Sequence, residues 1–537
     1  MPLIVLGTFS ALLIAAHSFP ESPLSGLLKE QRAQLGVAHP DTLSTMVSYA
    51  SFLSDNEENE ASAGIFLEAY ETLKASKGEN AVETLIVSNN LATVYHNMGS
   101  FEEASKYFEL TLEGLILTKG EDHDDTLMIM DNAADHYWEA QVFERSLNMY
   151  RFVLNHRRAK LGETAPQVLA GAEYFATKLM DFDESTAEAG PLLEEVLAAR
   201  RLTQSDGSQD LLSAINNYAM YLHKVDRLDE AEPLFREALS VHRAMSSESP
   251  EKLDAYLRVS ENLAILLREK SRHKEAEELF REIHNRRKEL LGEEHPVTLN
   301  SCNNLASILH MMGFIEEALP LYESTLHNRR KHLGPEDPDT LSTQSNYATI
   351  LLDLDRASEA VPIFKDNYNL RKRVLGDEHK DTLRSLVNLA NGFRAVGKAG
   401  EANRAYKGAV DVQRRILGDA HPDTITSMEN FASYLIEQDR KGEATVLFRA
   451  AVAARRKLLG DNHKHTQAAI KRFATFLAAR GATIEADELR KLVLPRDSGS
   501  EGEQTKVDDE DPEEKGMSHM QPPSPVDESS DSHEEEL

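Results

Sequence analysis

Apolar residues recur along most of the chain with a period of about 42 residues. An alanine marks each copy, and a large apolar side chain follows it three positions later in every copy. Side chains three or four positions apart lie on one face of a helix, so each alanine marks a predicted amphipathic helix. The eleven alanines are Ala50, Ala92, Ala134, Ala176, Ala219, Ala264, Ala306, Ala348, Ala390, Ala432 and Ala474.

A second helix is predicted twelve residues further on, where a small residue is followed four positions later by an aromatic ring. The small residues are Ala104, Ala231, Ala276, Ala318, Ala360, Ala402, Ala444 and Ala486, and the rings are Phe108, Phe235, Phe280, Tyr322, Phe364, Tyr406 and Phe448. We call the two helices of a copy helix A and helix B. A residue that tolerates a left-handed turn stands between them. These residues are Gly99, Gly313, Asp355, Gly397, Asp439 and Gly481.

The string Leu-Gly-x-x-His-Pro-x-Thr joins one copy to the next. Its glycine suits the end of helix B, its proline cannot continue that helix, and we expect Asp or Thr to cap the next helix A. The string spans 35–42, 291–298 and 417–424, with looser copies at 333–340, 375–382 and 459–466. One copy could not bury its apolar face alone, so the copies are predicted to stack into one solenoid.

The pattern resembles the tetratricopeptide repeat, with small residues at its eighth and twentieth positions and an aromatic at its twenty-fourth. The longer unit, with its linker string, Asn-Leu-Ala and Glu-Ala-x-x-Leu-Phe/Tyr, is similar to the kinesin light chain type, and residues 261–280 are typical. The resemblance covers about 35–494 and implies an all-α, right-handed solenoid of about eleven helix-turn-helix units. Kinesin light chains have a long coiled coil before the array, which we do not expect in the 34 residues that precede it here.

The segments flanking the array differ from it in composition. Residues 1–18 are an apolar leader, which is either a secretory signal peptide or a degenerate helix packed on its neighbour. Residues 19–34 are predicted to form a capping helix that begins at Ser22-Pro23. Residues 495–537 hold 15 acidic and 3 basic residues. We expect this acidic tail to be disordered, because it has too little apolar surface to offset its ordering entropy.

The array has one irregular stretch, near residues 180–255. There the linker strings decay and the spacing of the alanines slips from 42 to 43 and then 45 residues. Two alternatives follow: a hinge between two blocks of repeats, or drift of the sequence with unbroken stacking.

Composition narrows the function. A net charge of −31 argues against nucleic acid or an anionic membrane as the main partner. The single cysteine, Cys302, excludes an internal disulfide framework and a Cys-rich zinc site. The chain has no phosphate-binding loop, dinucleotide fingerprint, H-E-x-x-H or G-x-S-x-G motif. We therefore predict a non-catalytic protein with no cofactor, no metal and no membrane span, located in the cytoplasm, or in the secretory pathway if the leader is a signal peptide.

An asparagine two residues before the marker alanine is the candidate binding position. Asparagine is a mediocre helix former, so its recurrence within helix A invites a reason. Its amide both donates and accepts, which suits an extended peptide backbone, and the resemblance implies this role for the position. The alternative is an amide bonded within its helix or to a neighbour. The residues are Asn90, Asn132, Asn217, Asn262, Asn304, Asn346, Asn388 and Asn430, with the unique Trp138 as either an interface anchor or a packing residue.

Two charged series have structural and functional interpretations. Arginines end helix B in most copies, where they suit the helix dipole and the acidic linkers, or alternatively form a track for an acidic ligand such as the tail. Linker histidines recur once per copy, so stacking should keep them too far apart to share a metal ion. They are His39, His123, His295, His379, His421 and His463.

The sequence therefore predicts a non-catalytic adaptor that binds a peptide or protein in the concave groove of the superhelix. The alternative is an assembly scaffold that holds several subunits or self-associates. In the tail, Ser500 and Ser532 each have a glutamate three residues later and Ser524 precedes a proline, so these serines are either phosphorylation sites or incidental residues of a solubilising segment.

Overall fold

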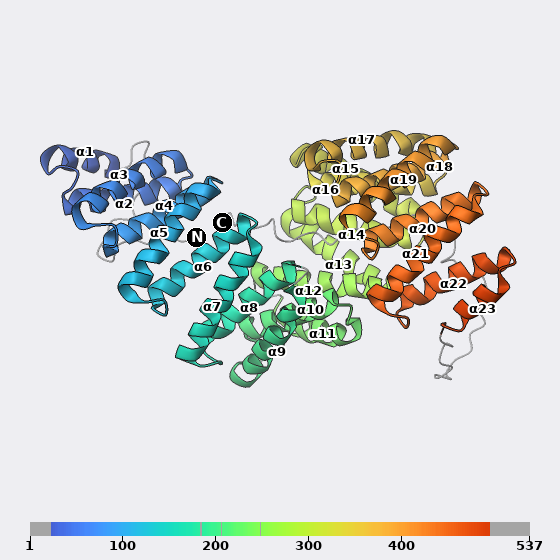
Figure 1. Ribbon diagram of the computed structural model, residues 1–537, viewed down its shortest axis with the longest axis horizontal. Coiled ribbons are helices and arrows are strands. Elements are labelled where there is room, and N and C mark those ends of the chain that lie inside the picture. The colour runs from blue at the N-terminus through green and yellow to red at the C-terminus, as the bar shows by residue number, and fades with distance from the viewer. Residues whose placement is uncertain (1–22, 183–184, 206, 247–248, 494–537) are drawn as a thin grey trace. The chain divides into compact units, whose positions relative to one another are not determined.

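The computed structural model describes residues 23–182, 185–205, 207–246 and 249–493. Within these ranges the chain forms 23 helices and no strand, and the helices follow one another as stacked pairs (Figure 1). The all-α repeat solenoid predicted from the sequence is confirmed. The leader, the acidic tail and its three candidate serines lie outside the described residues.

Eleven helices occupy the predicted positions of helix A. They are α2 (Pro40–Asp55), α4 (Val82–Asn97), α6 (Asp124–Glu139), α8 (Pro166–Asp181), α10 (Gln209–Lys224), α12 (Pro250–Glu269), α14 (Pro296–Met311), α16 (Pro338–Asp353), α18 (Lys380–Ala395), α20 (Pro422–Glu437) and α22 (Lys464–Ala479).

Eleven more occupy the positions of helix B, and α1 (Pro23–Gln34) precedes the first pair. The B helices are α3 (Asn59–Lys77), α5 (Phe101–Lys119), α7 (Phe143–Leu161), α9 (Thr186–Thr203), α11 (Leu228–Met245), α13 (His273–Leu291), α15 (Ile315–His332), α17 (Ala357–Leu375), α19 (Ala399–Ile416), α21 (Lys441–Leu459) and α23 (Thr483–Arg490).

The chain divides into two compact units, Met1–Ala255 and Tyr256–Leu537, called unit 1 and unit 2 here. The division falls within α12. Unit 1 has a core that runs from α1 to α6 and includes Phe66 and Phe108. The carboxyl half of unit 2 has a core around Tyr406. The hinge and drift alternatives for the irregular stretch both stay predictions.

The marker alanines lie where helices A and B of one repeat cross. All eleven are at most 1% exposed, because only a small side chain lets the two backbones approach closely. In two repeats a serine takes the second small position and also donates a hydrogen bond to the marker alanine of its repeat. Ser62 Oγ bonds the carbonyl oxygen of Ala50 and Ser146 Oγ that of Ala134, both at 2.7 Å. The predicted aromatic positions fill the space beside these crossings.

The turns between helices A and B have the predicted left-handed conformation. The backbone φ angle is +80° at Gly313 and +57° at Asp355. Side chains that favour this conformation less also adopt it, with φ of +62° at Glu57 and +60° at Gln141. The stacking of the repeats therefore imposes the turn even where the sequence does not favour it.

The linker histidines are structural, as predicted, and they cap the next helix A. In each of the six linkers the histidine has extended backbone angles, and its ring accepts a hydrogen bond from the amide two residues later. At His295 the Nδ1 atom lies 3.3 Å from the amide nitrogen of Val297. The expectation that Asp or Thr of the string supplies the cap was wrong for these helices, because histidine already satisfies the first free amide. An aspartate, Asp337, caps α16.

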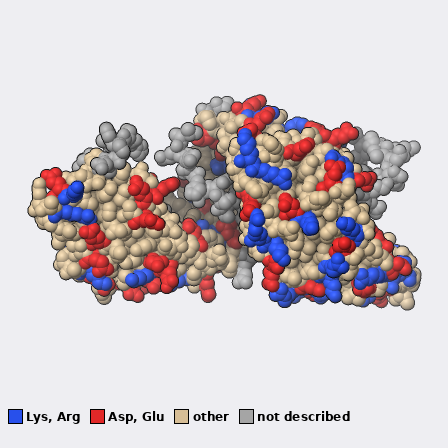
Figure 2. Space-filling view, turned by 90° about the horizontal axis from the view of Figure 1, so that it is seen from above, with Lys and Arg blue, Asp and Glu red and all other residues tan. Residues whose placement is uncertain are grey.

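The arginines at the ends of the B helices pair with the acidic linkers, which favours their structural interpretation. Arg414 pairs with Asp419 of its own linker at 2.7 Å, and Arg415 pairs with Glu378 of the preceding linker at 2.7 Å. Arg456 and Asp461 repeat the first of these pairs at 2.6 Å. Acidic and basic side chains accordingly lie next to one another over the surface in Figure 2.

Candidate functional site

The candidate site is the surface that the A helices form together within each unit, called the A face here. The A helices of successive repeats contact one another, as α8 does with α10 and α16 does with α18, whereas successive B helices are more widely spaced. Each unit therefore curves with its A helices on the inner side.

The predicted asparagines all lie on this face, but their exposure differs. Asn90 is fully buried and Asn304 is 7% exposed. The other six are partly exposed, namely Asn132, Asn217, Asn262, Asn346, Asn388 and Asn430. In unit 2 the asparagines follow on consecutive A helices from α12 to α20. In unit 1 the row is interrupted in α8, where Tyr174 takes the position.

Four of these amides are hydrogen-bonded across the boundary between repeats. Each donates to the residue three positions before the marker alanine in the preceding repeat, whether that residue is Glu, Asn or Ser. The bonds run from Asn217 Nδ2 to Glu173 Oε1 (2.8 Å), from Asn304 Nδ2 to Glu261 Oε1 (2.8 Å), from Asn346 Nδ2 to Asn303 Oδ1 (3.4 Å) and from Asn388 Nδ2 to Ser345 Oγ (2.9 Å). The structural alternative for the asparagines therefore accounts for one bond of each of these amides.

A buried cation lies under several of the acceptors. Arg287 is 4% exposed and pairs with Glu261 at 2.8 Å, and Arg200 pairs with Glu173 at 2.7 Å. Burial is the main influence on the Glu173 carboxyl and raises its pKa, which the nearby guanidinium opposes. Arginine at this position of helix B thus links its own repeat to the A face.

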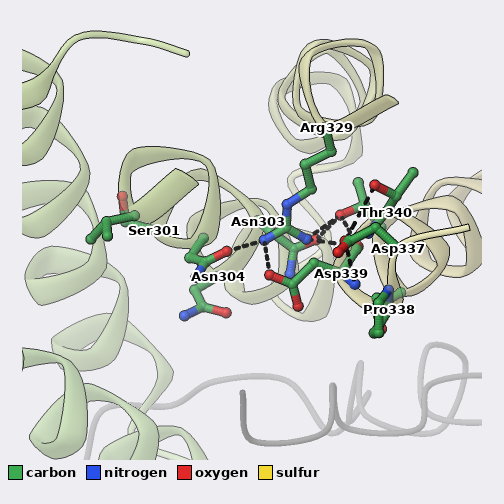
Figure 3. A network of polar contacts seen from close by, with 12 residues as sticks. Ser301, Asn303, Asn304, Arg329, Asp337, Pro338, Asp339 and Thr340 are labelled. Carbon is green, nitrogen blue, oxygen red and sulfur yellow. Dashed lines mark hydrogen bonds and ion pairs between the residues drawn. The ribbon is translucent and has the colours of Figure 1, made fainter. Parts of the chain in front are cut away.

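Arg329 fills the same position where the acceptor is neutral. Its Nη1 donates to Thr343 Oγ1 at 2.6 Å and to the carbonyl oxygen of Asp339 at 2.8 Å, both in α16, and its Nη2 donates to Asn300 in α14. Figure 3 shows the side chain reaching from α15 toward Asn303 and the start of α16. This side chain is 2% exposed, and burial lowers its pKa. One arginine therefore connects three successive helices.

A second series of ionic contacts runs along the A face near the ends of the helices. A cationic or imidazole side chain four residues after the marker alanine meets a carboxylate five residues after the next one. The pairs are His96 with Glu139 (3.0 Å), His310 with Asp353 (2.7 Å) and Arg394 with Glu437 (Nε to Oε2, 2.8 Å). Sequence reasoning missed this series, although its spacing of 43 residues is visible once the marker alanines are aligned.

Trp138 lies on α6 at the same position as those cations, and it is partly exposed. The Phe143 ring packs edge-on against its indole, with centroids 4.9 Å apart. The Lys178 ammonium of α8 lies 5.1 Å from the indole centroid and 5.3 Å from that of Tyr174. The unique tryptophan therefore packs inside the protein on one side and holds a cation on the other.

A buried histidine pair lies next to Trp138, and it has no counterpart in the sequence-based prediction. His136 is fully buried, with Nδ1 at 3.2 Å from His96 Nδ1 and Nε2 at 2.8 Å from Ser105 Oγ. Burial, helped by the neighbouring His96 ring, lowers the pKa of His136 to about 4. In the described part of the chain, no three His, Cys, Asp or Glu side chains are grouped so that they could hold a metal ion. None of the described helices is long and apolar enough to cross a bilayer.

Comparison with known families decides the identity of the repeat. One tetratricopeptide repeat model matches residues 41–116, 83–159, 255–331, 339–414 and 388–457, and a second matches 211–251. Together these matches cover more than half of the chain. The chain belongs to the tetratricopeptide repeat family. A search of curated proteins found no match.

Solved structures with a similar arrangement include kinesin light chain-like repeats. A Podosopora anserina protein described as a kinesin light chain with nearly identical TPR-like repeats is 27% identical, over 37% of this chain and 95% of that one, with a TM-score of 0.33. BtubC from P. vanneervenii is 19% identical, over 45% and 92%, with a TM-score of 0.36. The apo quorum sensor NprR from B. thuringiensis is 15% identical, over 70% and 98%, with a TM-score of 0.45.

Proposed function

We propose that this tetratricopeptide protein is a non-catalytic adaptor that binds a peptide or protein segment along its A face. The observation that carries the proposal is the row of amides on consecutive A helices of unit 2, two of which, Asn346 and Asn388, are both partly exposed and hydrogen-bonded to the preceding repeat. Such a row matches the repeated donors and acceptors of an extended backbone.

The bonds between repeats support this role because they order the amides. An asparagine amide has two N–H donors and two acceptor positions, and each bond described above uses a single N–H. That bond selects one side-chain conformation in advance, so a ligand would not have to supply the ordering entropy. The same bond also joins two repeats, and a structural role and a binding role therefore coincide at this position.

The test substitutes Asn346→Ala and Asn388→Ala together in the full chain. These two are preferred to Asn304, because their acceptors are neutral and no buried carboxylate loses a partner. The probe is an array of extended peptides of random sequence. We expect the wild-type chain to select a defined short motif and the double variant to lose that selection while its unfolding transition stays nearly unchanged.

The matched control is Asn369→Ala, which removes an exposed amide from a B helix, α17. Motif selection that survives the double substitution contradicts binding by the amides. Selection of no peptide, together with concentration-dependent self-association in sedimentation, favours the assembly scaffold instead.

A further inference from the structure

The acidic excess of the chain is unevenly distributed between the units. Residues 1–255 contain 41 acidic and 19 basic residues, a net charge of −22, whereas residues 256–494 contain 34 acidic and 37 basic residues, a net charge of +3. A field of one sign over a surface attracts ligands of the opposite sign and repels those of its own. The A face of unit 1 is therefore suited to a cationic partner in a way that unit 2 is not.

One place on that A face already holds a cation between two rings. The Lys178 ammonium lies 5.1 Å from the centroid of Trp138 and 5.3 Å from that of Tyr174. Both distances are within the range in which an aromatic face attracts a cation. The Tyr174 side chain stands where other repeats have asparagine, and 45% of it is exposed. Phe143 supports the indole from behind.

Carboxylates border the two rings. Asp135 Oδ1 accepts hydrogen bonds from the Tyr174 hydroxyl, at 2.7 Å, and from the Tyr150 hydroxyl. Glu139 is exposed at the end of the same helix, α6, and contacts His96. Burial, followed by the charge of Asp135, raises the pKa of the Tyr174 hydroxyl. The rings therefore stay neutral and the carboxylates around them outnumber Lys178.

We propose that the A face of α6 and α8 binds an arginine-bearing basic segment of a partner protein, whose guanidinium takes the place of Lys178 over Trp138 and Tyr174. The proposal rests on the A face being the binding surface and names the chemistry of the partner in unit 1. Exchange of one cation for another leaves the local charge balance unchanged, so neighbouring basic residues and backbone contacts of the partner supply the net gain. A guanidinium is planar and stacks on aromatic faces, so arginine is favoured over lysine.

The structure provides its own reporter for this exchange. Trp138 is the only tryptophan of the chain, so tryptophan fluorescence of the full-length protein reports on this place alone. The probes are hexa-arginine, hexalysine and hexaglutamate peptides, titrated at low ionic strength. We expect a saturable change with hexa-arginine, a weaker one with hexalysine and none with hexaglutamate.

Two variants and a control test the geometry. Tyr174→Leu removes one ring and should weaken hexa-arginine binding about tenfold. Lys178→Gln removes the competing cation and should tighten it by about threefold or more, which a merely structural role of Lys178 would not produce. Lys106→Gln is the control, because Lys106 lies 5.3 Å from the Tyr107 ring on a B helix, away from the A face.

The proposal is overturned if Lys178→Gln weakens hexa-arginine binding, or if hexaglutamate binds and loses its affinity in that variant. The second outcome would make Lys178 a contact for an acidic partner and would leave the A face as the binding surface. Equal responses of all the variants to hexa-arginine would mean that charge alone, and not the ring pair, holds the peptide. Failure of the asparagine double variant to affect peptide selection would instead concern the proposed function itself.

Discussion

The buried histidine pair predicts that unit 1 loses stability in mild acid. His136 is fully buried, and its pKa of about 4 lies below the ordinary value of 6.5. Because the unfolded chain binds this proton more readily than the folded chain, unfolding is favoured as the pH falls through 6.5 toward 4. The contribution is fully present above the unfolded value and is lost progressively below it.

The magnitude follows from the two pKa values. Linkage gives a loss of about 2 kcal/mol in the free energy of unfolding between pH 7 and pH 5 from His136 alone. His96 adds to the loss in the same direction, because burial lowers its pKa too, although Glu139 and Asp135 oppose that shift. Arg145 acts on His136 in the same direction as burial.

The assay is urea unfolding of the full chain at pH 7, 6 and 5, followed through Trp138, which lies two residues from His136 in α6 and so reports on unit 1. The variant His136→Phe removes the titrating ring and places a similar ring among Phe101 and Phe108, the aromatic neighbours of the imidazole. We expect the variant to lose most of the pH dependence, whatever its constant offset in stability.

The control is His123→Asn, which replaces a partly exposed capping histidine of the same helix with another capping residue. It should keep the wild-type slope with pH. The reasoning is refuted if wild-type unfolding is unchanged between pH 7 and pH 5, or if His136→Phe has the same pH dependence as the wild type.

Three further predictions concern the contacts between repeats. Arg329→Met should leave the acceptors in α14 and α16 with fewer donors and cost about 2 kcal/mol, seen as roughly thirtyfold faster hydrogen exchange in those helices, whereas exposed Arg330→Met should change little. His295→Ala should cost about 1 kcal/mol of stability near α14, and His295→Asn should restore most of it, as read by the same exchange measurement. Ala306→Leu should overpack a fully buried helix crossing and lower the thermal transition of the chain, by about 1–3 kcal/mol of stability.

The fold was predictable because the packing rule repeats. A fully buried alanine such as Ala306 recurs at constant spacing, so eleven noisy copies indicate the same crossing. The capping atom was not predictable from that rule, since His, Asp and Thr of one linker are all chemically able to cap. The turns at Glu57 and Gln141 were missed for a similar reason: stacking imposes a left-handed backbone that neither side chain favours.

The candidate site was predictable in position but not in its contacts. The asparagine row was visible in the sequence, yet its partners lie 43 or 44 residues away on the preceding repeat and vary in type from Glu173 to Ser345. A partner that varies gives no repeated letter to find. The buried role of Arg329 was hidden as well, because an exposed arginine, Arg330, follows it directly and the two look alike in the sequence.

The departures from the repeat are therefore the informative positions. Contacts such as Asn346 with Asn303 join neighbouring repeats, and in a solenoid such nearest-neighbour terms supply the stability that one repeat lacks. Tyr174 gives up that contact in α8, and Asp131, which would have been its acceptor, pairs with Arg157 at 2.6 Å instead. A position that abandons a stabilising rule without distorting its neighbours is expected where a surface serves another purpose, and that position borders Trp138.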